Sequence, residues 1–270
     1  MPLGETEVSD TAIIKCSPWQ AFDWEGAGPI SALITDPPYS AKTESGSRSS
    51  GGSGNSSRRT SHSCKRTGHY SGSPEHNVDY GHIVADDAVE LAAVFSGLVK
   101  DWAVIFCDHV AWQWHAKAWE ECGWYVFAPV PWLKRNGAPR FQGDGPASMT
   151  EWLMIARPRK VPSVCFSRSG YYETSIYREQ GARRRAGHKA PQELVRLVND
   201  YSEPGDLVAD PFAGTATVGS ACIRRGRRYV GTEVDEEACV QAERRLLETP
   251  PPLPGLTESR RPTQLSMEEL

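Results

Sequence analysis

The sequence predicts a doubly wound α/β domain, in which helices cover both faces of a mostly parallel sheet. Short apolar runs such as WAVIFC at 102–107 alternate with segments of helical periodicity. The 270 residues are 39% hydrophobic and 24% charged, which is typical of a globular protein and excludes a collagen-like or coiled-coil chain. No apolar run reaches the roughly 18 residues that span a bilayer, so we expect no membrane contact.

The individual elements follow from their residue patterns. We expect strands at 12–14, 30–34, 102–107, 124–132, 151–156, 207–209 and 228–231. We expect helices at 89–99, 110–122, 191–201 and 236–247. One more helix is expected after the turn at 212–217, and it ends at about residue 224. Gly123 suits the position just after a helix, and Pro191 suits the first position of one.

The elements predict a single domain over residues 1–249, interrupted by one compositional break. Residues 40–77 hold 12 Ser and 6 Gly and carry a local charge of +4, although the whole chain is −4. Such a segment buries too little apolar area to offset its ordering entropy, so we expect a flexible basic loop over 40–79. The Pro-rich tail at 250–270 is expected to be disordered.

The seven cysteines are scattered, odd in number and without a CxxC pair. They predict no disulfide framework, and we expect a reducing cytoplasm. The N-terminus MPLGETEVSD is polar and acidic, unlike a secretory signal. The histidines and the cysteine within 62–76 match no zinc spacing, so we expect no metal site.

Residues 207–235 contain the parts of a nucleotide-binding unit. An apolar strand runs into the small-residue turn 212–217, and a second strand ends at Glu233, 19 residues after Gly214. That spacing puts an acid where ribose hydroxyls bind, and the single firm glycine favours an adenosine ligand over a pyrophosphate. The alternative is an ordinary strand-turn-helix unit in which Glu233 binds no ligand.

The tetrapeptide Asp36-Pro37-Pro38-Tyr39 follows another apolar run. Two prolines fix the backbone and remove two N–H groups, which leaves carbonyls free to accept hydrogen bonds. Asp36 and the Pro37 carbonyl can accept both hydrogens of a planar exocyclic amine while Tyr39 stacks on its ring. The alternative is that the two prolines only end the strand and that the tyrosine side chain only packs against its neighbours.

These segments, in this order, resemble S-adenosylmethionine-dependent DNA amino-methyltransferases of the permuted beta class. DPPY comes first and DPFAGTA at 210–216 comes late, with Ala216 where a second glycine is usual. YVGTEVD at 229–235, GHKAP at 187–191, and VPWLKRNG at 130–137 with Glu151-Trp152 are similar to further family segments. The sequence departs from the family after Ile14, where Lys15-Cys16-Ser17 replaces the usual Gly-Asp.

The resemblance implies a Rossmann-like methyltransferase fold, S-adenosyl-L-methionine as cofactor, and a short target-recognition insert at 158–187. The implied catalytic residues are Asp36, Pro37, Pro38 and Tyr39. The implied cofactor-binding residues are Lys189, Asp210, Phe212, Ala213, Gly214, Thr215, Thr217 and Glu233.

The resulting hypothesis is a site-specific DNA methyltransferase that acts on N6 of an adenine flipped out of double-stranded DNA. Cytosine N4, a protein or RNA amine, and a catalytically silent DNA-binding relative are the alternatives. We expect a cytoplasmic protein of bacterial or phage origin. The sequence leaves open a homodimer and a restriction endonuclease partner.

Overall fold

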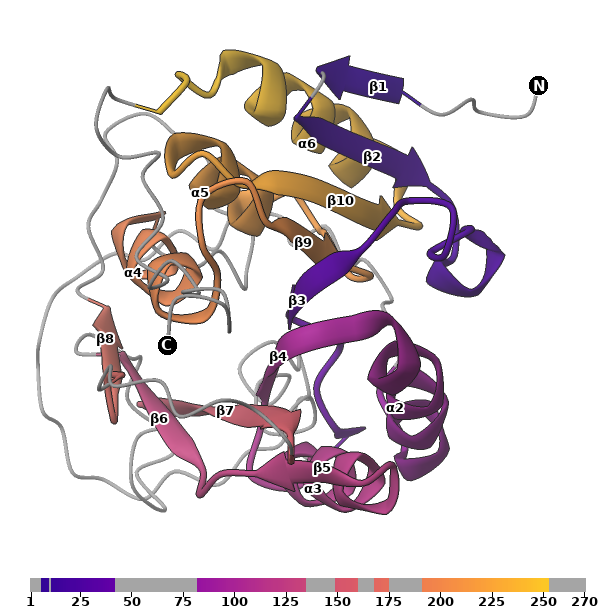
Figure 1. Ribbon diagram of the computed structural model, residues 1–270, viewed down its shortest axis with the longest axis vertical. Coiled ribbons are helices and arrows are strands. Elements are labelled where there is room, and N and C mark those ends of the chain that lie inside the picture. Colours follow the sequence, from indigo (N-terminus) through magenta and orange to yellow (C-terminus); the bar gives the residue numbers. More distant parts are fainter. Residues whose placement is uncertain are drawn as a thin grey trace, which may run out of the picture.

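The computed structural model describes residues 6–9, 11–41, 82–134, 149–159, 168–174 and 191–252. Within these residues, one ten-stranded sheet runs through the molecule in the order β1-β2-β10-β9-β3-β4-β7-β6-β8, and β5 also pairs with β7 (Figure 1). The strands are β1 (Thr6–Ser9), β2 (Ala12–Cys16), β3 (Ile30–Thr35), β4 (Val99–Cys107), β5 (Trp124–Val126), β6 (Val130–Lys134), β7 (Thr150–Pro158), β8 (Tyr172–Thr174), β9 (Leu207–Asp210) and β10 (Arg228–Glu233).

The central five strands, β2, β10, β9, β3 and β4, are parallel to one another. Antiparallel strands flank them, with β1 on β2 and β7 on β4. Strands β5 and β6 are antiparallel to β7, and β8 is parallel to β6. The prediction of a mostly parallel sheet is therefore confirmed.

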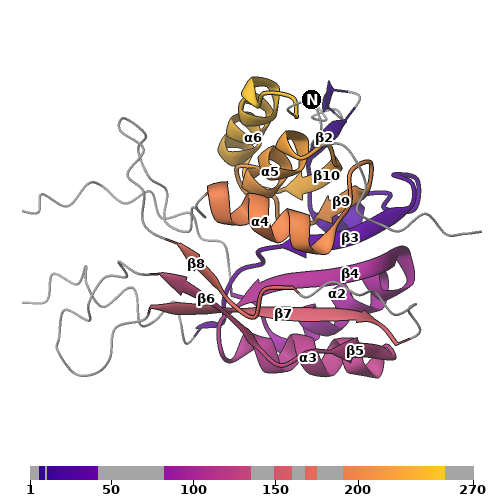
Figure 2. The same ribbon diagram turned by 60° about the vertical axis from the view of Figure 1, so that its left-hand side comes forward.

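Helices cover both faces of this sheet, as a doubly wound fold requires (Figure 2). They are η1 (Trp19–Ala21), α2 (Ala85–Leu98), α3 (Ala111–Glu121), α4 (Pro191–Tyr201), α5 (Thr217–Arg224) and α6 (Glu236–Glu248). Helices α4, α5 and α6 pack on one face, and α2 and α3 pack on the other.

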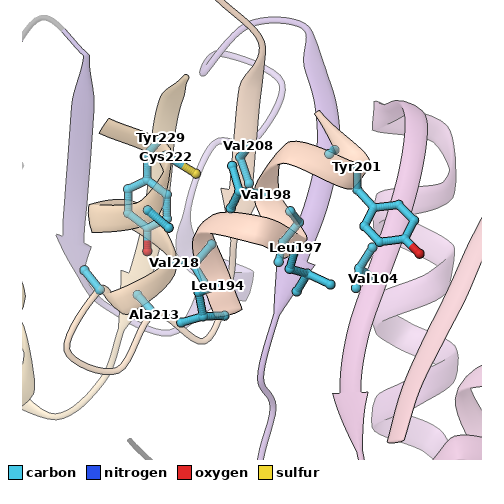
Figure 3. Packing of buried hydrophobic residues seen from close by; sticks show 14 of the residues in the cluster. Val104, Leu194, Leu197, Val198, Tyr201, Val208, Ala213, Val218, Cys222 and Tyr229 are labelled. Carbon is cyan, nitrogen blue, oxygen red and sulfur yellow. The ribbon is translucent and has the colours of Figure 1, made fainter. Parts of the chain in front are cut away.

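The alternation of strand side chains divides the core between the two faces. Val208 of β9 belongs to the cluster under α4, while its neighbours Leu207 and Ala209 belong to the cluster on the other side. Val198 of α4 lies beside Val208 in Figure 3, Leu194 lies near Val218 of α5, and both α4 side chains are fully buried. Burying one such side chain contributes roughly 1.5–3 kcal/mol, so this contact fixes α4 on the sheet.

The strand predicted at 124–132 is interrupted, so that prediction was wrong in its continuity. Val126 pairs with Ala156 and Val130 pairs with Leu153, so the three residues between Val126 and Val130 oppose two residues on β7. The extra residue forms a bulge, and Pro129, which lacks an N–H, lies within it.

The boundaries of the first long helix also differ from the prediction. Helix α2 begins at Ala85, Val89 is 50% exposed, and Val99 already belongs to β4. Strand β1 was not predicted because TEVS is polar, and it pairs at the edge of the sheet.

A disulfide joins Cys16 at the end of β2 to Cys239 in α6. The scattered cysteines predicted no disulfide, which was wrong for this pair, because its two cysteines lie 223 residues apart and no local pattern signals their contact. Cys107 and Cys222 are buried thiols, whereas Cys122 is exposed.

Several predictions fall on residues outside the described part of the chain. These are nearly all of the 40–79 loop, Lys189, and residues 253–270 of the tail. Of the 158–187 insert, the described part includes β8, whose Tyr172 is fully buried in the core. Within the described residues, no helix is long and apolar enough to cross a membrane.

Candidate active site

The DPPY segment and the small-residue turn leave the sheet at the same edge. Strands β3 and β9 are parallel neighbours, with Leu33 opposite Ala209, so the residues that follow them emerge side by side. The Thr35 hydroxyl donates a 2.7 Å hydrogen bond to the Asp210 carboxylate across this pair. Two segments 175 residues apart in sequence are thus directly connected.

The DPPY tip is anchored at its far end. Pro37 is buried, while Asp36, Pro38 and Tyr39 keep partial exposure. The Tyr39 carbonyl accepts a 3.3 Å hydrogen bond from the backbone N–H of Ile83. The following residue, Ser40, donates its N–H and hydroxyl to the carboxylate of Asp108, at 2.9 and 2.5 Å. The tip is therefore a fixed element of the site.

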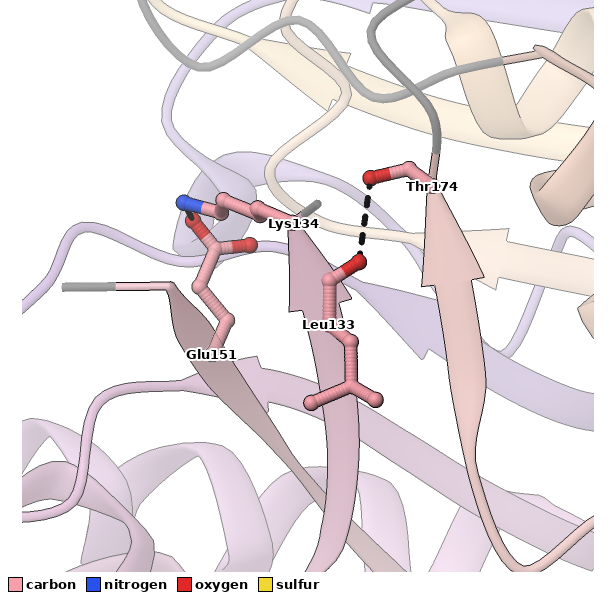
Figure 4. Close-up of polar contacts among 4 residues, drawn as sticks. All are labelled: Leu133, Lys134, Glu151 and Thr174. Carbon is pink, nitrogen blue, oxygen red and sulfur yellow. Dashed lines mark hydrogen bonds and ion pairs between the residues drawn. The ribbon is translucent and has the colours of Figure 1, made fainter. Parts of the chain in front are cut away.

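The Tyr39 side chain belongs to a charged network. Its phenol donates a hydrogen bond to Glu151 of β7, and its pKa is held well above the usual value, first by burial and then by the charges of Asp36 and Glu151. Glu151 also pairs with Lys134 at the end of β6 (Figure 4). Tyr39 therefore stays neutral, and Glu151 holds its hydroxyl.

Strand β8 supports that network from the edge of the sheet. The Thr174 hydroxyl donates a 3.3 Å hydrogen bond to the Leu133 carbonyl, next to Lys134 (Figure 4). Glu151 is opposite Trp132 in the β6–β7 ladder, so Lys134 and Glu151 lie on adjacent strands. This register brings the predicted segments around 134 and 151 together at the DPPY tip.

The small-residue turn after β9 is anchored to β10. The N–H of Ala213 donates to the Thr232 carbonyl at 2.9 Å, and the Thr232 hydroxyl donates to the Pro211 carbonyl at 2.8 Å. Gly214 and Ala216 have positive φ values of 54° and 53°. The αL backbone at Ala216 explains why glycine is the usual residue there, since glycine adopts it without strain.

Asp210 lies beneath this turn, with only 1% of its surface exposed. Its carboxylate accepts hydrogen bonds from Thr35, from the Tyr229 hydroxyl and from the Phe212 N–H. Burial raises its pKa to about 7, against the lowering effect of those hydrogen bonds. The carboxylate thus connects β3, β10 and the turn.

Glu233 sits at the end of β10 with its carboxylate aimed at the turn. One oxygen accepts from the Gly214 N–H at 2.8 Å, and the other accepts from the N–H groups of Val234 and Asp235. Cys16 is opposite Glu233 on β2, at the point where the sequence lacks the usual acid. The backbone therefore holds an acceptor for hydroxyl groups beside the glycine turn.

The structure brings together the described residues that the sequence singled out: Asp36, Pro37, Pro38, Tyr39, Asp210, Phe212, Ala213, Gly214, Thr215, Thr217 and Glu233. Sequence reasoning missed Thr35, Ser40 and Asp108. An acid directly after a buried strand and before a helix signals a helix start, and Asp108 does accept from the first N–H groups of α3. Its bond to Ser40 has no sequence signal.

Residues 30–244 match the N6/N4 methyltransferase family, described as DNA methylase. The type II methyltransferase M.Cfr9I of Citrobacter freundii is 33% identical over 142 residues, which cover 45% of this chain and 44% of that protein. The DNA adenine methyltransferase YhdJ of Escherichia coli K12 is 43% identical over 53 residues, 20% of this chain and 18% of that protein. The matches span less than half the length of these relatives.

Two solved structures share the fold. The complex of M1.HpyAVI with SAM has a TM-score of 0.59 at 20% identity and covers 87% of this chain and 99% of that one. The cytosine-N4-specific PvuII DNA methyltransferase has a TM-score of 0.59 at 13% identity, over 89% and 88% of the two chains. Because the family match extends over most of the sequence, including DPPY and the glycine turn, the chain belongs to the N6/N4 DNA methylase family.

Proposed function

We propose that the protein transfers a methyl group from S-adenosyl-L-methionine to the exocyclic N6 amine of an adenine flipped out of double-stranded DNA. The observation that carries this proposal is the Thr35–Asp210 hydrogen bond between adjacent parallel strands. It links the end of β3, just before the DPPY tip, to the end of β9, just before the small-residue turn, which supports a shared site for an amine and an adenosine at one edge of the sheet. The carboxyl edge of a parallel sheet is where such folds bind their ligands.

The residues at the turn fit the adenosine part of this cofactor. Glu233 presents a carboxylate, held by three backbone N–H groups, that can accept from ribose hydroxyls. A Cβ on Gly214 would meet no atom within 4 Å, so the turn borders open space there. When bound, the cofactor supplies an electrophilic methyl group. Phe212, Ala213, Thr215 and Thr217 belong to the same turn, and Lys189 is proposed to contact the cofactor.

The DPPY tip then acts on the amine. Asp36 and the Pro37 carbonyl accept its two N–H groups, which orients the nitrogen lone pair and stabilises positive charge as it develops. Tyr39 stacks on the base, and the Glu151 hydrogen bond holds the hydroxyl end of its side chain. Pro38 stiffens the tip, so most of the rate enhancement comes from positioning.

The choice of adenine rests on the Asp at the first position of the motif, which in the resembling family goes mostly with adenine. YhdJ is named an adenine methyltransferase and PvuII a cytosine-N4 enzyme, so cytosine N4 is the second candidate. Protein would be incubated with unmethylated duplex DNA and cofactor, and the nucleosides would be measured by mass spectrometry. We expect N6-methyladenine, and N4-methylcytosine alone would overturn the adenine assignment.

A second measurement separates an enzyme from a silent DNA-binding relative. Calorimetry should detect binding of S-adenosyl-L-methionine, and no binding at millimolar cofactor would refute catalysis. Asp36→Ala should bind cofactor with little change while methyl transfer falls by orders of magnitude. Asp206→Ala is the control, because its carboxylate accepts the Glu203 N–H just before β9, at the opposite end of that strand.

A further inference from the structure

Asp108 connects the DPPY tip to the strand on its other side. It follows β4, the parallel neighbour of β3, and only 6% of its surface is exposed. One carboxylate oxygen accepts from Val110 and Ala111 at the start of α3, at 2.9 and 2.8 Å. The other accepts both the N–H and the hydroxyl of Ser40. A single buried side chain therefore links a helix start to the residue directly after Tyr39.

We propose that Asp108 is a positioning residue for methyl transfer, which fixes the end of the DPPY tip by holding Ser40 against the start of α3. The proposal rests on the function proposed above and assigns Asp108 no contact with substrate. Its effect runs through the backbone of Ser40 to the ring of Tyr39 and to the Pro37 carbonyl.

The burial of the Asp108 carboxylate argues that these contacts are specific. A buried carboxylate is costly unless hydrogen bonds replace its lost water, and here four N–H and O–H donors converge on it. A cap for α3 would need only Val110 and Ala111. The two bonds to Ser40 are additional, and both lie within charge-assisted hydrogen-bond distance.

The opposite end of the tip is fixed in the same manner. Thr35, just before Asp36, bonds to the carboxylate of Asp210 on β9. Ser40, just after Tyr39, bonds to the carboxylate that follows β4. The five residues 36–40 are thus held between the two strands that flank β3. A displacement of about 1 Å at a reacting group can lower a rate about 100-fold, so loosening one end should be visible in catalysis.

The test separates the link to Ser40 from the helix cap. In Asp108→Asn, the remaining oxygen can still accept from Val110 and Ala111, but the amide nitrogen cannot accept from the Ser40 N–H. Hydrogen exchange in the full-length protein should show a faster Ser40 amide while the Ala111 amide stays protected. Single-turnover methyl transfer at saturating DNA and cofactor should fall about 100-fold, with cofactor affinity changed less than about twofold.

Ser40→Ala removes only the hydroxyl bond and should lower the single-turnover rate roughly tenfold. The double variant should be less impaired than the product of the two effects, because both act on one contact. Asp206→Ala provides the control for loss of a carboxylate–backbone bond, and its transfer rate should equal that of the unaltered protein.

Hydrogen exchange, the transfer rate and the cofactor affinity each give an outcome that can overturn the proposal for Asp108. An unchanged Ser40 amide in Asp108→Asn would overturn the proposal, as would faster exchange with an unchanged transfer rate. A fall in cofactor affinity equal to the fall in rate would assign Asp108 to the cofactor site instead. If the unaltered protein methylates no DNA, the proposed function fails, and hydrogen exchange alone still decides whether Asp108 fixes the tip.

Discussion

Asp210 gives the folded state a specific dependence on pH. Its pKa is raised by burial from an ordinary 3.8 to about 7, although Thr35, Tyr229 and Phe212 donate hydrogen bonds to it. Between those pH values the folded protein keeps a proton that the unfolded chain has released. The free energy of unfolding therefore decreases as pH rises from about 4 to 7, and it levels off above.

The size of this effect follows from the width of the pH window. Each pH unit contributes about 1.4 kcal/mol, so about three units amount to roughly 4 kcal/mol. Asp210→Asn removes the titration and keeps the contacts, because its oxygen can accept from Thr35 and Phe212 while its amide donates to the Tyr229 hydroxyl. We expect the variant to match the unaltered protein near pH 4 and to exceed it by up to roughly 4 kcal/mol at pH 8.

Urea unfolding followed by circular dichroism at pH 4.5, 6 and 8 measures this difference. Other groups titrate over the same range in both proteins, so the difference between the two curves isolates Asp210. Glu120→Gln, at an exposed position on α3, is the control. Its free energy of unfolding should differ from that of the unaltered protein by the same amount at every pH. The account of a buried, protonated Asp210 is refuted if the free energy of unfolding of Asp210→Asn has the same pH dependence as that of the unaltered protein. It is also refuted if Asp210→Asn is the less stable protein at pH 8.

Three further changes test other parts of the structure. His115 is buried, and neither of its ring nitrogens has a hydrogen-bond partner within the described residues. Burial lowers its pKa to about 4, although the negative charge of Asp108 acts in the opposite direction. Stability should therefore be full above pH 6.5 and fall by up to roughly 3 kcal/mol toward pH 4, a loss that His115→Leu should lack in urea titrations. Gly219→Ala would place a Cβ 2.7 Å from two buried side chains and should cost about 1–3 kcal/mol, whereas Gly97→Ala, with nothing within 4 Å, should not lower the melting temperature. Reduction of the Cys16–Cys239 disulfide should lower the free energy of unfolding by about 2–4 kcal/mol, and equal urea midpoints with and without reductant would contradict this.

The parts of the site that were predictable from sequence are those encoded locally. Asp36 and Tyr39 share one tetrapeptide, and Gly214 and Glu233 lie 19 residues apart within one strand-turn-helix-strand unit. Local spacing fixes the geometry of such a unit, because a strand and a helix have known lengths.

The links between the units were not predictable in this way. Thr35 and Asp210 are 175 residues apart, and Ser40 and Asp108 are 68 apart. Each link depends on which strands become neighbours in the sheet, and periodicity carries no information on strand order. The same limit applies to the Cys16–Cys239 pair.

The anchoring of the tip extends to the two described chain ends beside it. The described chain leaves at residue 41 and returns at residue 82, directly beside the DPPY tip. The backbone bond from Ile83 to the Tyr39 carbonyl joins the two ends, and Asp108 holds the departing end at Ser40. The geometry of Asp36 and Tyr39 therefore depends on Ser40 and Ile83 keeping their bonds to Asp108 and to the Tyr39 carbonyl at these two ends.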